Sequence, residues 1–303
     1  MEYILQTKNL VKTYGKQNAL DGLNMNIEKG SIYGFVGKNG AGKTTLIRLI
    51  CGLQNPTEGE FTLFGKSSKD RDIYKARKKM GAVIEKPAFY SDLSAKENLK
   101  MQNTMLGVPA DENVEELLSL VGLSDTGKKK AGKFSLGMKQ RLGIAIALCG
   151  NPEFIVLDEP INGIDPQGII EIREIILKIN REKGVTVLIS SHILDELSRL
   201  ATHYGFIDKG RIVEELSAKE LEAKCRKYSK VEVNNIEVLK KILSDQGYEY
   251  ELTGENSANV FAKLNVSKLV ADLSAEGAEL ISINESDESL ENYYISLVGK
   301  EQS

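Results

Sequence analysis

The sequence has little cysteine and histidine, and it has no long apolar run. Its 303 residues include three cysteines and two histidines, too few histidines to favour a histidine-rich transition-metal site. Cys51, Cys149 and Cys225 share no ligand-like spacing, which favours reduced thiols used as small apolar residues. No stretch of about 18 uncharged apolar residues occurs, so no transmembrane helix is predicted. Residues 1–5 lack the basic flank and apolar stretch of a signal peptide, and we expect a cytoplasmic protein.

The composition is that of an ordinary folded protein, but its charge is divided unevenly. Hydrophobic residues make up 41% and charged residues 27%, which excludes a disordered, collagen-like or coiled-coil chain. Residues 1–228 carry 34 basic and 29 acidic side chains, whereas residues 229–303 carry six and fourteen. The net charge therefore changes from +5 to −8, which predicts a domain boundary between the two segments.

The acidic segment 229–303 has enough apolar residues for a small α/β domain. Its pattern predicts strand, helix, strand, strand, helix, strand and helix, in that order. The candidate core residues are Val231, Val233, Val260, Phe261, Leu264, Leu280, Ile281 and Ile283. In the last helix, apolar residues at three- and four-residue spacing form a stripe for docking: Leu290, Tyr293, Tyr294 and Leu297. We expect this domain to serve regulation or dimerisation rather than catalysis.

A basic run at 66–79 raises the question of nucleic-acid binding. Asp70 and Asp72 interrupt the run, and Tyr74 is its only interior aromatic residue. A solvated face is therefore the favoured interpretation, and we expect no nucleic-acid partner.

The first segment alternates short β-branched runs with helical patterns. Buried strands are predicted at 31–36, 154–157 and 185–190, and helices at 44–53, 94–106, 111–121, 135–148 and 165–181. Short connections between alternating strands and helices favour an α/β fold with a parallel sheet covered by helices.

A glycine-rich loop between the first strand and helix carries the most specific motif. Residues 37–44 fit G-x-x-x-x-G-K-[ST], the pattern of a phosphate-binding loop. Its glycines let successive N–H groups point at one anion, and the helix N-terminus adds partial positive charge. Lys43 is expected to neutralise the β- and γ-phosphates, and Thr44 to offer a hydroxyl to Mg²⁺. The candidate nucleotide-binding residues are Gly37, Lys38, Asn39, Gly40, Ala41, Gly42, Lys43, Thr44 and Thr45.

Two carboxylates follow the predicted strand 154–157. Asp158 and Glu159 stand where ligands bind in open α/β sheets, at the carboxyl end of a strand. Asp158 can hold Mg²⁺ through water, and Glu159 can accept a proton from an attacking water as a general base.

Four further segments resemble motifs of the ATP-binding cassette (ABC) proteins. Residues 135–141 resemble the signature segment usually written L-S-G-G-Q, and they begin 23 residues before Asp158. Residues 162–166 resemble the D-loop, and His192 stands at the position of the switch histidine. Tyr14 occupies the position of the aromatic residue that stacks on adenine. The ordered match covers residues 3 to about 225.

The resemblance implies an α/β P-loop NTPase with a parallel core sheet, an antiparallel β subdomain and an α-helical subdomain at about 86–150. Two copies would meet head to tail and bind two ATP and Mg²⁺ between them. Ser135 and the Gly137 amide would then contact the γ-phosphate held by the opposite subunit, and Asp165 would line the seam between the subunits. His192 would act with Glu159 in catalysis.

The signature and the loop after residue 84 depart from the common family pattern. Phe134, Leu136 and Met138 replace the usual Leu, Gly and Gln of the signature. Glu85 stands where the family normally has a Gln that touches Mg²⁺ and the transporter, so it is a candidate metal-shell residue. The combination of Glu85, this signature and the segment Pro-Ala-Phe-Tyr at 87–90 resembles the ATPases of bacitracin-type and lantibiotic-immunity exporters.

We therefore expect the ATPase subunit of an ABC transporter, peripheral on the inner face of the cell membrane through a separate permease. The contact with the permease is expected from Glu85 to Glu97 and Asn98, with Phe89 and Tyr90 as anchors. Two alternatives are a soluble ABC protein acting on ribosomes or DNA, and a phosphoryl-transfer kinase. One phosphate loop, no zinc cysteines and the presence of the signature argue against them.

Overall fold

The computed structural model describes residues 2–225, 228–262, 264–286, 293–295 and 297. The chain forms two compact units, Met1–Ala218 and Lys219–Ser303, so the division falls ten residues before the change in charge. Residues 219–228 carry four basic and two acidic side chains, and composition alone therefore groups them with the first unit. In the structure, most of helix α8 (Ala218–Lys224) belongs to the second unit.

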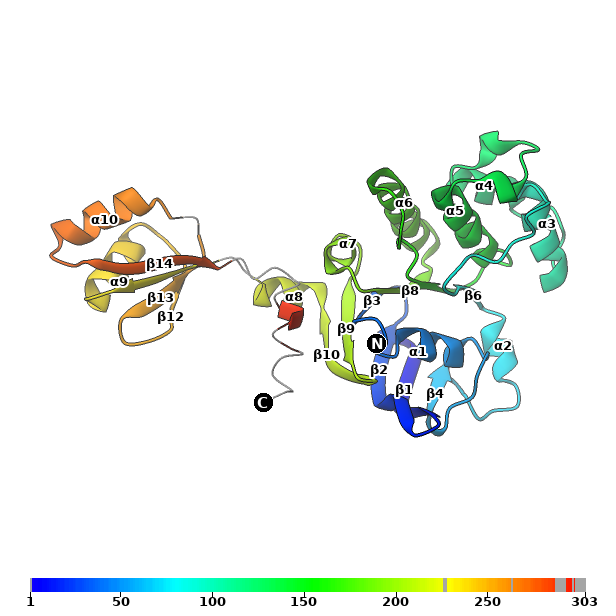
Figure 1. Cartoon of the computed structure of the whole chain (residues 1–303), viewed down its shortest axis with the longest axis horizontal. Coiled ribbons are helices and arrows are strands. Elements are labelled where there is room, and N and C mark those ends of the chain that lie inside the picture. The colour runs from blue at the N-terminus through cyan, green and yellow to red at the C-terminus, as the bar shows by residue number, and fades with distance from the viewer. Residues whose placement is uncertain (1, 226–227, 263, 287–292, 296, 298–303) are drawn as a thin grey trace. The chain divides into compact units, whose positions relative to one another are not determined.

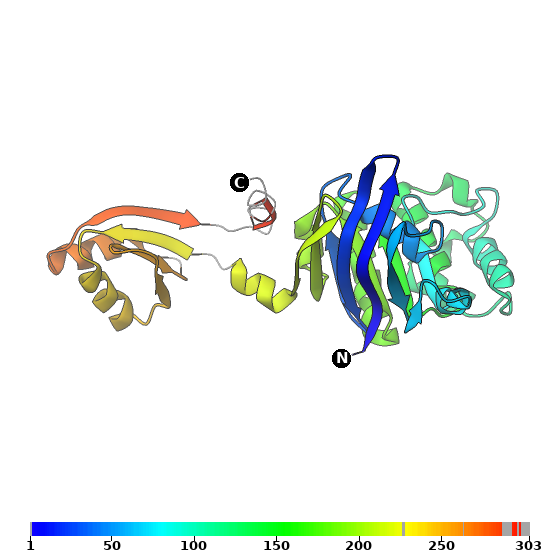
Figure 2. The same cartoon turned by 90° about the horizontal axis from the view of Figure 1, so that it is seen from below.

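The first unit contains an antiparallel and a largely parallel sheet. The antiparallel sheet has the order β2-β1-β4-β5, with β1 Tyr3–Tyr14, β2 Gln17–Glu28, β4 Glu58–Leu63 and β5 Lys66–Ser67. Strands β1 and β2 are its long blue strands in Figure 2. The second sheet has the order β10-β9-β3-β8-β7-β6 and is parallel except for β10. Its strands are β3 Ile32–Val36, β6 Met80–Val83, β7 Phe154–Asp158, β8 Thr186–Ser191, β9 His203–Asp208 and β10 Arg211–Ser217.

Helix α1 (Lys43–Ile50) packs in the core between these two sheets (Figure 1). Four of its residues are fully buried in a cluster that includes residues of β1, β2, β3 and β7: Leu46, Ile47, Leu49 and Ile50. The helices α2 (Ile73–Arg77), α6 (Pro166–Lys183) and α7 (Leu194–Ser198) complete the unit around the sheets. The predicted α/β fold with a parallel core sheet and an antiparallel β subdomain is confirmed.

Between β6 and β7 the chain forms a helical subdomain of α3 (Ala95–Leu106), α4 (Val114–Leu120) and α5 (Leu136–Ala147). The predicted capping box is present: Ser94 accepts from the Glu97 N–H, and Glu97 accepts from the Ser94 N–H. Helix α5 also packs closely on the sheet, because a Cβ atom at Gly81 of β6 would lie 1.8 Å from the Ala147 carbonyl oxygen. This close approach holds the subdomain against the edge strand of the sheet.

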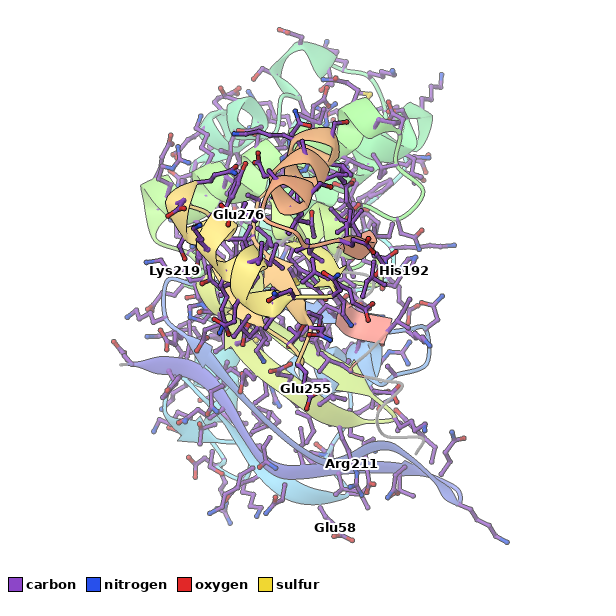
Figure 3. All side chains as sticks on the ribbon, turned by 90° about the vertical axis from the view of Figure 1, so that its left-hand side faces the viewer. Glu58, His192, Arg211, Lys219, Glu255 and Glu276 are labelled. Atoms are coloured by element: carbon purple, nitrogen blue, oxygen red, sulfur yellow. The ribbon has the colours of Figure 1, made fainter. Side chains whose placement is uncertain are left out.

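The second unit is a four-stranded antiparallel sheet with two packed helices. Its sheet order is β12-β13-β11-β14, with β11 Tyr228–Val233, β12 Tyr250–Leu252, β13 Ser257–Val260 and β14 Leu280–Ser286. The helices α9 (Ile236–Asp245) and α10 (Val266–Ala275) contribute Leu239, Leu243 and Leu273 to its core. Lys241 Nζ of α9 lies 3.0 Å from an oxygen of Glu276, which follows α10 and is labelled in Figure 3.

Two predictions for this unit concern its core and its last helix. Ile281 is 59% exposed, so its prediction as a core residue is wrong. A register shift between β11 and β14 pairs Val233 with Leu280 and Glu232 with Ser282, which leaves Ile281 as the extra residue of a bulge. In the predicted last helix, Tyr293, Tyr294 and Leu297 are helical, whereas Leu290 lies outside the described residues.

The cysteines are free thiols. Burial raises the pKa of Cys51 and of Cys149 to about 12, which keeps both thiols protonated and unreactive at neutral pH. No helix in the described part of the chain has the length and apolar character needed to cross a membrane.

Candidate functional site

The strand order brings the separate sequence motifs to one edge of the sheet. Strand β8 pairs in parallel with β3 on one side and with β7 on the other. The phosphate loop follows β3, Asp158 ends β7, and His192 follows β8. Because the carboxyl ends of parallel strands meet at the same edge, residues more than 100 positions apart in the chain become neighbours there.

At Gly42 the phosphate loop adopts a backbone conformation that only glycine allows. Its φ is +115°, and a Cβ atom there would lie 2.6 Å from the Ala19 carbonyl oxygen. Gly42 is also the N-cap residue of α1, so the helix begins directly at the loop. The N-terminus of α1 is thus positioned to bind an anion.

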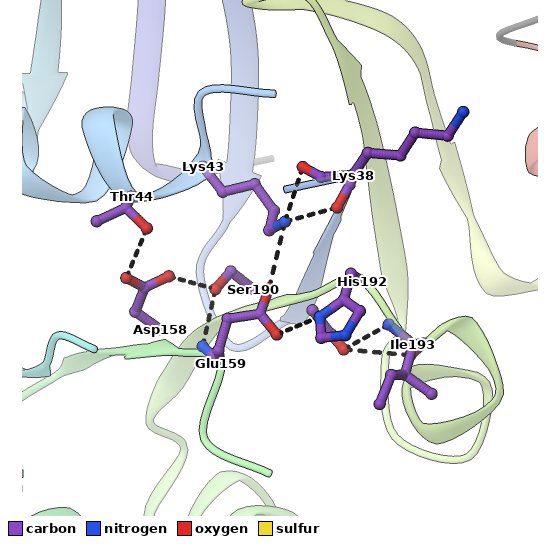
Figure 4. A network of polar contacts seen from close by, with 10 residues as sticks. Lys38, Lys43, Thr44, Asp158, Glu159, Ser190, His192 and Ile193 are labelled. Atoms are coloured by element: carbon purple, nitrogen blue, oxygen red, sulfur yellow. Dashed lines mark hydrogen bonds and ion pairs between the residues drawn. The ribbon is translucent and has the colours of Figure 1, made fainter. Parts of the chain in front are cut away.

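Lys43 is buried in this loop and turns its side chain back across it. Its Nζ donates to the carbonyl oxygens of Gly37 at 2.5 Å and Lys38 at 3.3 Å. The same Nζ lies 3.2 Å from Glu159 Oε1, with the carboxylate side chain 18% exposed (Figure 4). A buried ammonium group therefore faces both the phosphate loop and the candidate base.

Asp158 is 1% exposed and is held by two hydroxyl groups. Thr44 Oγ1 donates to Asp158 Oδ2 at 2.9 Å, and Ser190 Oγ donates to Asp158 Oδ1 at 2.6 Å (Figure 4). Oxygen atoms of a hydroxyl and a carboxylate are ligands that Mg²⁺ prefers. The chemistry of Thr44 and Asp158 therefore fits a magnesium site.

Glu159 and His192 form a hydrogen-bonded pair beside this group. His192 Nδ1 lies 2.8 Å from Glu159 Oε2. The backbone of Glu159 has φ +49°, a left-handed conformation that is uncommon for residues other than glycine and is often found at functional sites. Glu159 also lines a small cavity of about 170 Å³, together with Ala19 and residues of the phosphate loop.

The remaining predicted nucleotide ligands lie on other surfaces of the first unit. Ser135 is exposed at the N-cap of α5, where its hydroxyl accepts from the Met138 N–H at 3.2 Å. A Cβ atom at Gly137 would meet no atom within 4 Å. Asp165 is exposed at the N-cap of α6 and makes no side-chain capping bond there. The Tyr14 ring is 45% exposed, and its hydroxyl pairs with Gln54.

Glu85 stands apart from the network of Asp158 and Glu159. It follows β6, the neighbour of β7, but its carboxylate pairs with Arg48 of α1 and its side chain is 56% exposed. Its proposed contact with Mg²⁺ remains a prediction.

Sequence reasoning missed Ser190, which bridges the two carboxylate residues. It is a fully buried serine that follows three apolar residues of β8, two residues before His192. A polar residue at the carboxyl end of a buried strand was the available signal, because buried hydroxyl groups need partners.

Comparisons with known proteins identify the family. The sequence profile described as "ABC transporter" matches residues 20–162. The chain is 40% identical over 305 aligned residues to the bacitracin transport ATP-binding protein BcrA of Bacillus licheniformis, covering 99% of this chain and 98% of that protein. The chain belongs to the ABC transporter ATP-binding proteins. It is also 47% identical to the lantibiotic transport ATP-binding protein SrtF of Streptococcus pyogenes, over 69% of this chain and 89% of that protein.

A solved structure agrees with this assignment. The dimeric ATP-binding cassette MJ0796, in a post-hydrolysis state with ADP and Pi, matches with a TM-score of 0.64 at 27% identity. The match covers 71% of this chain and 98% of that one. The chain is therefore an ATP-binding and ATP-hydrolysing subunit of the ABC transporter class. Neither alternative, a ribosome- or DNA-acting protein or a kinase, is favoured by these relatives.

Proposed function

We propose that two copies of the chain bind two ATP and Mg²⁺ head to tail and so drive a separate membrane permease. Each site would combine the phosphate loop of one copy with Ser135 and Gly137 of the other. The small cavity at Lys43 supports this arrangement, since about 170 Å³ is less than the volume of a typical ligand pocket and leaves much of a nucleotide for a second surface to cover. Asp165 would line the seam, and Tyr14 would stack on the adenine ring.

Mg²⁺ would be held by Thr44 and, through water, by Asp158. It would neutralise charge on the β- and γ-phosphates. Lys43 would bind the same phosphates, and Glu159 would accept the proton of the attacking water. His192, at 2.8 Å from Glu159, would orient that carboxylate and stabilise charge near the γ-phosphate.

Exposed apolar residues between Glu85 and the end of α3 support a permease-docking surface. Tyr90 is 53% exposed, and Met101 and Met105 of α3 are 41% and 67% exposed. Asn98 is 2% exposed, and its side chain bonds the Tyr90 N–H at 2.7 Å and the Tyr90 carbonyl at 3.0 Å. Asn98 is thus too buried to contact the permease itself, and it would act by fixing the position of Tyr90.

The transported cargo would be a peptide antibiotic, moved out of the cell or its membrane. The observation that carries this proposal is the similarity to the bacitracin transport protein over 99% of the chain, a span that includes the second unit. The solved cassette, by contrast, matches over only 71% of the chain. The similarity therefore extends beyond the common ATPase domain.

The test is ATP turnover in vesicles that hold the chain together with its membrane permease. We expect bacitracin or a lantibiotic to raise turnover several-fold, and an unrelated cationic peptide to leave it unchanged. Stimulation must be absent when Glu159→Gln replaces the wild-type chain. A permease that binds the chain but responds to neither antibiotic would contradict the cargo proposal alone.

A second experiment addresses the C-terminal unit. We expect truncation after Lys227 to leave a folded chain with ATP affinity within about twofold of the full chain, because every proposed nucleotide ligand precedes residue 200. Dimer formation or permease-stimulated turnover should fall, which sedimentation and vesicle assays measure. Loss of ATP binding in a truncated chain with a cooperative thermal transition would refute this division of roles.

A further inference from the structure

Through a single side-chain atom, Ser190 contacts both Asp158 and Glu159. Its Oγ lies 2.6 Å from Asp158 Oδ1 and 3.0 Å from the Glu159 backbone nitrogen. The side chain is fully buried in β8, between the strand that leads to the phosphate loop and the strand that ends in Asp158.

The direction of both hydrogen bonds follows from the donors available. The Glu159 N–H is a donor, so it must donate to a lone pair of the Ser190 oxygen. The single hydroxyl proton of Ser190 is then free for the Asp158 carboxylate, which can only accept when it is ionised. A hydrogen bond to a carboxylate in a buried site is stronger than one between neutral groups.

The two bonds fix different properties of the site. Thr44 holds Asp158 Oδ2 and Ser190 holds Oδ1, so the carboxylate cannot rotate without breaking one of them. The bond to the Glu159 N–H supports a residue whose φ is +49°. That amide also donates to the Ser190 carbonyl at 3.2 Å, so it keeps a partner when the hydroxyl is removed. Asp158 Oδ1, by contrast, loses the one donor that it has among the described residues.

We propose that Ser190 is a positioning residue that orients Asp158 for Mg²⁺ and, through the backbone, Glu159 for the attacking water. The proposal rests on the magnesium role given above to Thr44 and Asp158. The effect of Ser190 should appear mainly in the dependence on Mg²⁺, because no second donor to Asp158 Oδ1 occurs in the part of the chain that the structure describes.

The test is the affinity of purified full-length chain for a fluorescent ATP analogue, measured by anisotropy across a Mg²⁺ titration and in EDTA. Mg²⁺ should raise the affinity for the ATP analogue, and we expect Ser190→Ala to increase the Mg²⁺ concentration that gives half of this rise about tenfold. A tenfold shift is in line with the loss of one charged hydrogen bond. Affinity in EDTA should stay within about twofold, and kcat should fall more than KM rises. Ser190→Thr, which keeps the hydroxyl, should have a Mg²⁺ titration close to that of the wild-type chain.

Thr186→Val is the matched control. Thr186 is fully buried on the same strand, and its hydroxyl accepts from the Gly30 N–H at 2.8 Å, at the other end of the sheet. The valine variant should show the wild-type Mg²⁺ titration. An equal shift in this variant would show a general defect of the strand and overturn the proposal.

A double variant makes the test independent of folding. In an Asp158→Asn background, Ser190→Ala should change the Mg²⁺ dependence by less than about twofold, because its partner is already gone. A full tenfold shift in that background, or no shift from Ser190→Ala alone, would overturn the role of Ser190. If the nucleotide affinity of the wild-type chain does not change with Mg²⁺, the proposed metal site is wrong, and this proposal with it.

Discussion

Replacing Glu159 by Gln should abolish ATP turnover while leaving ATP binding intact. The amide keeps the size of the side chain and its contact with His192, but it cannot accept the proton of the attacking water. General-base catalysis is worth about 10²- to 10⁴-fold, and we expect a loss in that range. ATP bound without turnover should then hold two copies together, so a dimer should accumulate on gel filtration with ATP and Mg²⁺.

Glu153→Gln provides the matched control for this change. Glu153 directly precedes β7, at the opposite end of the strand from Glu159, and its carboxylate lies 3.0 Å from Lys79 Nζ on the surface. Exposed ion pairs contribute about 0–1 kcal/mol, so turnover should stay within about twofold of wild type. Near-normal turnover in Glu159→Gln, beside a normal control, would remove Glu159 from the mechanism.

The main motifs could be predicted because each lies at the end of a strand or the start of a helix. The phosphate loop, the pair Asp158 and Glu159, and His192 each follow a short apolar run, and parallel pairing then brings them together. The capping box at Ser94 was predictable for a similar reason, since both of its hydrogen bonds are formed within four residues of chain.

The partners that individual polar side chains find in the folded chain could not be predicted from the sequence. Ser190 and Asp158 are 32 residues apart, and only the alignment of β7 with β8 makes them neighbours. The pairing of Glu85 with Arg48 joins α1 to the loop after β6 over 37 residues. Asn98 had the polarity of a surface residue, yet it is buried because three backbone carbonyls nearby accept its amide protons.

Register shifts between paired strands could not be predicted from the sequence either. Ile281 alternates correctly with Ile283 for a strand that buries one face. One bulge against β11 is enough to turn it to the exposed side, and no turn residue marks the position.

Two single substitutions in different halves of the proposed site should each abolish turnover. Lys43→Ala removes the buried ammonium group that faces the phosphates and leaves the Glu159 carboxylate without its cation at 3.2 Å. Lys43 would also lose its charge pair with the phosphates of ATP, and removing one partner of such a binding pair costs about 2–5 kcal/mol, so ATP affinity should fall at least about thirtyfold. Thermal melting should show that this variant is folded.

Ser135→Arg should act without disturbing the fold or the variant's own phosphate loop. Ser135 is exposed, and its capping bond to the Met138 N–H is worth about 1 kcal/mol. The arginine would instead block the approach of a second copy's γ-phosphate. ATP should still bind to the isolated subunit with wild-type affinity, whereas turnover should be lost.

The most direct test of the shared site is turnover in an equal mixture of these two inactive variants. In a head-to-tail dimer of one copy of each, the intact phosphate loop of the Ser135→Arg copy meets the intact signature of the Lys43→Ala copy. Random pairing makes half of the dimers mixed, each with one intact site, so about a quarter of wild-type turnover should return. A mixture no more active than its two components measured separately would contradict a site built from two subunits.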